Sequence, residues 1–169
     1  MREASLEEVP TLLSLLRMAF EEYRGRLVPP SGVQTETVES LTKKLTAGHA
    51  VIASVDKEPA GCVFFQVESS FMYLGRLAVL PEFRNYGIGT ALVKYVEERT
   101  RQLQISSVRL GVRVGLVRLQ RYYERIGYKV LRAGSHEGYQ EPTYVIMEKV
   151  LGVNRAEQAI GADPPEEVS

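Results

Sequence analysis

The chain has 169 residues, 44% hydrophobic and 25% charged, which is enough apolar material for one globular domain with its own core. Lysine plus arginine and aspartate plus glutamate each number 21, so the formal net charge is zero and no overall basic field favours nucleic-acid binding. The chain has one cysteine, Cys62, so it cannot form an intramolecular disulfide. Because the whole sequence has only this cysteine and two histidines, we expect no metal site.

The first third of the sequence predicts two helices joined by a loop. A capping-box pattern at Ser5–Glu8 precedes apolar residues that recur at three- and four-residue steps as far as Tyr23. The next segment, Arg24–Gln34, contains two glycines and two prolines and is expected to be a loop. Thr35–Ala47 follows as a second, shorter helix.

Aromatic and β-branched residues then predict an antiparallel meander of three strands, at His49–Val55, Ala60–Glu68 and Phe71–Val79. Asp56–Pro59 is the expected turn between the first two strands. Cys62 falls on the second strand, where we expect it to be a small buried side chain.

The second half of the chain alternates helices and strands, at Gly87–Leu103, Ser107–Arg113, Leu116–Arg125, Tyr128–Ala133 and Thr143–Val150. The resulting order is α-α-β-β-β-α-β-α-β-β, with room for a short strand at the N-terminus. This order indicates an α/β (α+β) fold in which helices flank a mixed, mostly antiparallel sheet.

We expect one domain over residues 1–150 and a mobile polar tail over 151–169, which contains Pro164 and Pro165. No apolar run is long enough to cross a bilayer, and no signal-peptide pattern precedes the first helix. The expected location is therefore the cytoplasm.

One segment stands out chemically: the third strand of the meander leads through a short turn into a helix that opens with Gly87 and Gly89. Bare backbone N–H groups at a helix start attract phosphate oxygens, and glycine lets a pyrophosphate approach the backbone closely. Neither the G-x-x-x-x-G-K-[ST] nor the G-x-G-x-x-G pattern is present. The alternative is that the glycines serve only a tight turn, although glycine lowers helix stability.

Two motifs carry a resemblance to a known family. Arg84-Asn85-Tyr86-Gly87-Ile88-Gly89 resembles the R-x-x-G-x-G/A acetyl-coenzyme A signature of the GNAT superfamily of N-acetyltransferases. Downstream, the segment Tyr122–Tyr128 resembles that family's L-Y-x-K-x-G-F motif. The order of elements also matches, so the resemblance covers roughly residues 2–150.

The resemblance implies acetyl-coenzyme A as cosubstrate. In the family, backbone amides of the signature loop hold the pyrophosphate, and the pantetheine arm pairs with the preceding strand like an added strand. The next parallel strand must then splay away, and Gly111 is placed to assist this. The implied cofactor-binding residues are Leu77, Ala78, Val79, Arg84, Asn85, Tyr86, Gly87, Ile88, Gly89 and Thr90.

The family's reaction is direct attack of an amine on the thioester, through a tetrahedral oxyanion. The resemblance assigns the oxyanion contact to a backbone N–H near Val79 and the protonation of the leaving thiolate to Tyr123. Many members place a glutamate on the strand before the signature, and this chain has none there. No single general base is therefore assigned: a chain of water molecules can take the proton, and Tyr73 is the best-placed polar side chain on that strand. A second departure is Leu116, which stands where the family often has asparagine.

The acceptor site of such a fold is usually walled by the first helix–loop–helix and the last hairpin. Arg24 and Arg26 are candidates to pair a substrate carboxylate, or else simply solvate a helix end. Phe71 and Tyr139 are candidates for an aromatic wall, for which packing is an equal alternative.

The leading hypothesis is an N-acetyltransferase acting on a primary amine of a small molecule or peptide, with neither nucleic acid nor a membrane as partner. Dimers are common in the family, so a homodimer is one expected state. Two alternatives remain open. One is a non-catalytic acyl-coenzyme A sensing module, and the other is an acetyltransferase for protein N-termini or lysines.

Overall fold

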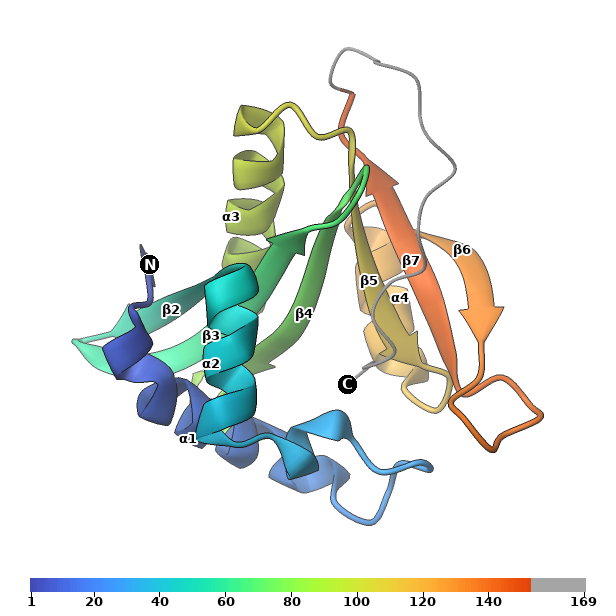
Figure 1. The fold of residues 1–169 in the computed structure, drawn as a ribbon, viewed down its shortest axis with the longest axis horizontal. Helices are drawn as coiled ribbons and strands as arrows, with labels where there is room; N and C mark the ends of the chain where they lie inside the picture. The colour runs from blue at the N-terminus through green and yellow to red at the C-terminus, as the bar shows by residue number, and fades with distance from the viewer. Residues whose placement is uncertain (153–169) are drawn as a thin grey trace.

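Seven strands form one sheet, in the order β1-β2-β3-β4-β5-β7-β6, in the computed structural model, which describes residues 1–152 (Figure 1). All neighbouring strands are antiparallel except β4 and β5. The predicted mixed sheet and the short N-terminal strand are confirmed, while the predicted tail lies outside the described residues from position 153 onward. The strands are β1 (Arg2–Glu3), β2 (His49–Val55), β3 (Glu58–Val67), β4 (Met72–Val79), β5 (Ser107–Arg113), β6 (Lys129–Gly134) and β7 (Tyr144–Val150).

Helices cover both faces of this sheet (Figure 1). Helices α1 (Val9–Phe20) and α2 (Val38–Ala47) lie on one face, and α3 (Ile88–Gln102) and α4 (Val117–Arg125) lie on the other. Each face of the sheet has its own hydrophobic core. A strand contributes side chains to both cores, because successive side chains along it point to opposite faces of the sheet. Thus Cys62 packs under α1, whereas Val63 packs under α3, and both are fully buried.

The turn between β2 and β3 is shorter than the sequence suggested. Only Asp56 and Lys57 form it, with φ angles of 48° and 69°, so Glu58 and Pro59 already belong to β3. Two consecutive left-handed residues suit a tight two-residue hairpin because they match the twist of the strands. Pro59 is tolerated there because it lies at the strand's start, beside an irregularity in the β2–β3 register.

Three helices start later than expected; α4 does so by one residue, because Leu116 is its N-cap and the helix begins at Val117. Helix α2 begins at Val38 because Thr37 caps it: the Thr37 hydroxyl accepts a hydrogen bond from the Ser40 N–H at 3.1 Å. Helix α3 begins at Ile88 because Gly87, with φ of 79°, stands in the left-handed region just before it.

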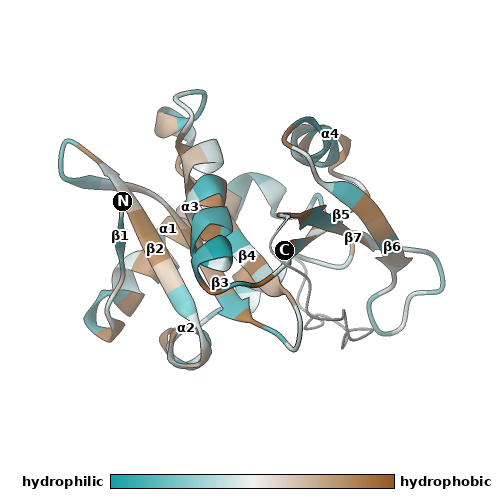
Figure 2. Ribbon diagram, turned by 90° about the horizontal axis from the view of Figure 1, so that it is seen from above, coloured by the Kyte–Doolittle hydropathy of each residue, from teal (hydrophilic) through white to brown (hydrophobic). Residues whose placement is uncertain are grey.

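The two halves of the sheet part between β4 and β5. These parallel strands pair only at Met72 with Val108 and at Tyr73 with Arg109, after which they diverge. Strand β5 instead pairs with β7 along its whole length, from Ser107 to Arg113. Figure 2 shows the parting from above, with β1–β4 on one side and β5–β7 on the other. The predicted splay of the strand after the long helix is thus present.

Strand β4 carries a bulge where it leaves β5. Gly75 pairs with Phe64 and Ala78 pairs with Cys62, so two β4 residues, Arg76 and Leu77, lie opposite one residue of β3. Arg76 has a φ of 51°, an uncommon conformation for a residue with a side chain. The bulge turns the end of β4 toward the space between the diverging strands β4 and β5.

Within residues 1–152, no helix is both long and apolar enough to cross a membrane.

The close packing of β3 on β4 gives a stability prediction. A Cβ built on Gly61 would lie 2.6 Å from the Ala78 carbonyl oxygen, which is backbone and cannot rotate away. We expect Gly61→Ala to lower the free energy of unfolding by about 1–3 kcal/mol. The measurement is urea denaturation followed by circular dichroism. Gly115→Ala is the matched control, because a Cβ there meets nothing within 4 Å, and equal effects of the two substitutions would contradict the prediction.

Candidate active site

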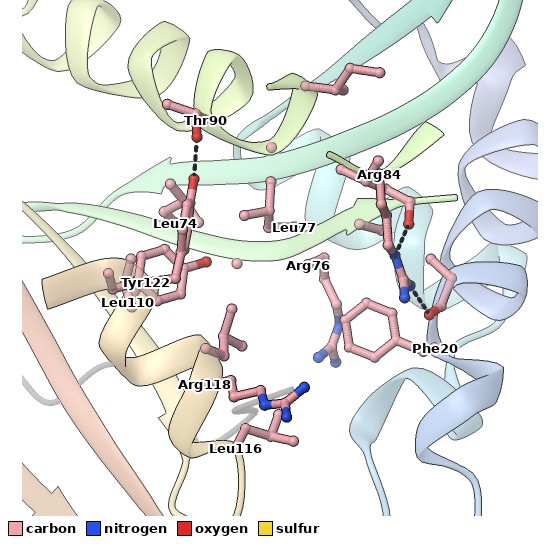
Figure 3. Close-up of a pocket in the computed structure, with 18 of the residues that line it drawn as sticks. Phe20, Leu74, Arg76, Leu77, Arg84, Thr90, Leu110, Leu116, Arg118 and Tyr122 are labelled. Atoms are coloured by element: carbon pink, nitrogen blue, oxygen red, sulfur yellow. Dashed lines mark hydrogen bonds between the residues drawn. The ribbon is translucent and has the colours of Figure 1, made fainter. Parts of the chain in front are cut away.

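A cavity of about 610 Å³ occupies the space between the diverging strands. Its walls come from β4, from Leu110 and Gly111 of β5, from the end of α1, and from the first turns of α3 and α4 (Figure 3). The cavity brings together most of the predicted site residues: Tyr73, Leu77, Ala78, Val79, Arg84, Asn85, Gly87, Ile88, Gly89, Thr90 and Tyr123.

The start of α3 presents bare backbone to this cavity. The first hydrogen bond of the helix runs from the Ala91 N–H to the Gly87 carbonyl, so the N–H groups from Gly87 to Thr90 have no acceptor within the helix. A Cβ at Gly87 would meet nothing within 4 Å, and one at Gly89 would meet only Val79 Cγ2, at 3.7 Å. With the positive end of the helix dipole behind them, these amides form a cradle suited to phosphate oxygens.

The Arg84 guanidinium does not direct an unpaired positive charge at these amides, because it already has three partners within the protein. Its Nε donates to the Val79 carbonyl at 3.1 Å, and one terminal nitrogen donates to the Ala19 carbonyl at 3.1 Å. The other terminal nitrogen forms an ion pair with Glu22 at 2.7 Å. The guanidinium therefore ties the loop and the end of β4 to the end of α1, as Figure 3 shows in part. Tyr86, with 77% of its surface exposed, does not line the cavity.

The outer edge of β4 faces the cavity without a strand partner beyond Tyr73. The Leu80 N–H donates to the Ala60 carbonyl at 2.9 Å, so the amides of β4 point alternately toward β3 and away from it. Val79 is one residue before Leu80, so its N–H points away from β3 and toward β5. The two strands have diverged at this level, and no residue of β5 pairs with Val79. An extended ligand can pair with such an edge as an added strand.

Tyr123 lies on the opposite wall, on α4, with 4% of its surface exposed. Burial, together with the neighbouring hydroxyls of Tyr122, Tyr23 and Tyr73, raises the pKa of its phenol well above the ordinary value. It therefore stays protonated across the neutral range and can act as a proton donor. Tyr122 is more than a packing residue, because its hydroxyl shares a hydrogen bond of 2.7 Å with Thr90 Oγ1 that links α4 to α3.

The predicted acceptor residues do not meet at the cavity. Phe71 is fully buried, with the Arg109 guanidinium 4.2 Å above its ring, so it packs and offers no wall to a ligand. Arg24 pairs with Glu21 at 2.9 Å on the surface. Arg26 and Tyr139 likewise do not line the cavity.

A buried ionic cluster that the sequence did not reveal lies at the bulge. The Arg76 guanidinium donates twice to Glu36 Oε1, at 3.0 and 2.8 Å, and both residues are less than 5% exposed. Glu36 also pairs with Lys44 at 3.2 Å and accepts a hydrogen bond from the Ser40 hydroxyl. A charged residue inside the apolar run of β4 implies a buried partner, but nothing in the sequence says that the partner lies 40 positions earlier.

A second buried arginine, Arg113, is near this cluster. Arg113, at the end of β5, is 2% exposed and donates to the carbonyls of Pro29 and Pro30 at 2.7 and 2.9 Å. Burial first, and then the charge of Arg76, lower the pKa of its guanidinium from the ordinary value. The two bonds fasten the loop after α1 against the C-terminal half of the sheet.

The described part of the chain contains no group of three His, Cys, Asp or Glu residues placed to hold a metal ion.

Residues 12–128 match the acetyltransferase (GNAT) family, and the chain belongs to that family. Membership places it among the acyltransferases by class. A comparison with curated protein sequences finds no match.

Solved structures of the same fold are similar over nearly the whole chain. The ribosomal-protein-S18-alanine N-acetyltransferase from Escherichia coli has a TM-score of 0.74 at 14% identity, covering 94% of this chain and 97% of its own. The PaiA N-acetyltransferase from Thermoplasma acidophilum, in complex with coenzyme A, has a TM-score of 0.69 at 22% identity, covering 88% and 96%. Ard1 from Thermoplasma volcanium has a TM-score of 0.71 at 18% identity, covering 89% and 95%. These likenesses show the fold.

The ion pair at the bulge predicts a pH dependence of stability. Burial by itself raises the pKa of Glu36, but the Ser40 hydroxyl, Arg76 and Lys44 outweigh it, so the pKa lies below its ordinary value. A carboxylate with a lowered pKa contributes stability above its unfolded pKa of about 4.3, and that contribution is lost as the pH falls through the folded pKa. At pH 7 we expect Glu36→Gln to cost about 3 kcal/mol of unfolding free energy, because it leaves a buried arginine without its counter-ion.

The measurement is urea denaturation at pH 7 and at pH 4. The difference between the wild type and Glu36→Gln should shrink at the lower pH. Glu39→Gln, an exposed position in the first turn of α2, three residues after Glu36, is the control and should show little difference at either pH. A gap for Glu36→Gln that stays constant with pH would contradict the assignment.

Proposed function

We propose that this protein transfers the acetyl group of acetyl-coenzyme A to a primary amine of a small molecule or peptide. One observation supports it above all: the bare amides at the start of α3, the unpaired edge of β4 and the hydroxyl-bearing Tyr123 all face one cavity. An anion cradle, a partner for an extended chain and a proton donor are what an acyl thioester of this shape requires.

The chain's residues fit coenzyme A at two places. The amides from Gly87 to Thr90 bind the pyrophosphate, and nothing would contact a Cβ at Gly87, so the cradle is open to a ligand. The main chain of Leu77 and Val79 pairs with the pantetheine arm along the parted edge of β4. Arg84 contributes by holding the loop rather than by contacting phosphate, since its guanidinium already has three partners. Bound there, acetyl-coenzyme A supplies an activated acetyl group.

Catalysis then depends on three positions. The Val79 N–H donates to the acyl oxygen as negative charge develops on it, a contact that is stronger in the transition state than in the ground state. Tyr123 donates its proton to the departing sulfur, and its raised pKa keeps that proton available. Tyr73, buried on β4 and lining the same cavity, relays the proton lost by the amine toward water.

The alternative of a non-catalytic acyl-coenzyme A module draws on one observation. Leu116 lines the cavity where the family often places a polar asparagine, so one contact to the pantetheine arm is replaced by an apolar one. A sensing module would bind acetyl-coenzyme A without releasing coenzyme A in the presence of any amine. Release of thiol over a panel of amines therefore separates the two functions.

A protein N-terminus or lysine as acceptor is the second alternative. The similar Escherichia coli structure is a ribosomal-protein-S18-alanine N-acetyltransferase, but 14% identity carries the fold only. The zero net charge of this chain gives no electrostatic attraction toward ribosomes, and we rank a small amine above a protein acceptor.

The cradle gives the first test of the function. We expect coenzyme A to bind in isothermal titration calorimetry, and Gly89→Val to weaken that binding at least about tenfold, because the branched side chain fills the approach to the backbone amides. Gly115→Ala, which lies outside the cavity lining, should leave binding unchanged. The absence of any heat of binding to the wild type would overturn the function.

The proton donor gives the second test. Tyr123→Phe removes only the hydroxyl, and we expect kcat to fall about 100-fold or more with little change in the Kd for coenzyme A. Tyr95→Phe is the matched control, since Tyr95 packs near Phe65 away from the cavity lining. Unchanged turnover by Tyr123→Phe would remove this residue from the mechanism.

A further inference from the structure

The charged side chains that line the cavity differ in whether the protein already neutralises them. Glu22 and Arg84 form an ion pair with each other, and Arg76 pairs with Glu36. Arg118 also lines the cavity, and within residues 1–152 it makes neither an ion pair nor a hydrogen bond. It is therefore the lining cation whose partner the described chain does not supply.

Arg118 lies on the α4 wall of the cavity, one helical turn before Tyr122. It is the second residue of α4, and Figure 3 shows its guanidinium directed toward the end where the Arg76 guanidinium also lies. Thr90, in the first turn of α3, is drawn at the other end of the same view. In the function proposed above, the amides at the start of α3 bind the cofactor's pyrophosphate.

Arg76 lies among other ionised side chains at this end of the cavity. Glu36 pairs with both Arg76 and Lys44, and Arg113 is near enough to Arg76 for the two charges to interact. These three cations already have partners, whereas the guanidinium of Arg118 has none within residues 1–152.

We propose that the acceptor is an amine that also carries a carboxylate, and that Arg118 binds this carboxylate at the Arg76 end of the cavity. This inference rests on the acetyltransferase function proposed above and specifies its substrate class. A planar guanidinium can bind a carboxylate through two parallel hydrogen bonds, which fixes the acceptor's orientation as well as its charge. A carboxamide of the same shape lacks the charge and one of the two acceptor oxygens. The sequence had assigned such a role to Arg24 and Arg26, neither of which lines the cavity.

Pairs of amines that differ only at this group test the proposal. The probes are glycine and glycinamide, β-alanine and its amide, and 4-aminobutyrate and its amide, each assayed by thiol release from acetyl-coenzyme A. For the wild type we expect kcat/KM to be higher for the carboxylate in at least one pair. In Arg118→Gln the carboxylate-to-amide ratio should fall by about tenfold, mainly through KM, as expected for loss of one charge-assisted contact.

Comparing the ratio between variants removes the intrinsic difference in basicity within each pair. Arg118→Lys should retain part of the preference, because the charge stays while the two-pronged geometry is lost. Arg121→Gln is the matched control: Arg121 is an exposed arginine on the same helix but outside the cavity lining, and its ratio should equal that of the wild type. An unchanged ratio in Arg118→Gln, or the failure of every carboxylate probe to be acetylated, overturns the proposal.

A second arm decides whether Arg118 serves the cofactor instead. Calorimetry with coenzyme A and with dephospho-coenzyme A compares the wild type and Arg118→Gln. We expect both affinities to be unaffected by the substitution. If Arg118→Gln binds coenzyme A no better than dephospho-coenzyme A while the wild type discriminates, the residue contacts the 3′-phosphate and the proposal is wrong. If the wild type binds neither, the acetyltransferase function itself fails, which distinguishes the two failures.

Discussion

The parting of β4 from β5 is the constraint on which the rest of the site depends. Two parallel strands in the middle of a sheet normally satisfy each other's main chain, yet here the pairing stops after Tyr73. On its other edge, strand β5 pairs with β7 along its full length. The main chain of β4 beyond the bulge is left without a strand partner on that side. Backbone groups in such a position need another partner, and an extended ligand can provide it.

The parted geometry is maintained by polar contacts that cross between elements. Arg84 joins the end of β4 to the end of α1, and the Thr90–Tyr122 hydrogen bond joins α3 to α4. At the bulge, Arg76 is held by Glu36 from the start of α2. Each contact fixes one wall of the cavity relative to another. The Arg84 guanidinium is thus occupied by contacts within the protein, whereas the helix start keeps N–H groups that have no acceptor within the helix.

The two ends of the cavity are built from different kinds of residue. Backbone amides, which any sequence with small residues at those positions can present, dominate the end at α3. Arginine side chains from the bulge and from α4 dominate the other end. In the proposed function, main chain at one end would bind the cofactor and side chains at the other would select the acceptor.

Local patterns in the sequence determined the elements and the cradle. Within residues 1–152, apolar periodicity predicted the four α-helices and the longer strands. The glycines and the two motifs located the start of α3 and Tyr123, because these features depend on neighbours within a few residues. The late start of α2 and the two-residue turn at Asp56 were missed because capping and turn geometry shift a boundary by only a few residues. The tertiary structure alone decided which side chains share the cavity. Arg76 meets Glu36 across 40 positions, Arg113 holds the proline loop, and Phe71 packs inside, and each outcome depends on long-range strand pairing that local patterns do not encode.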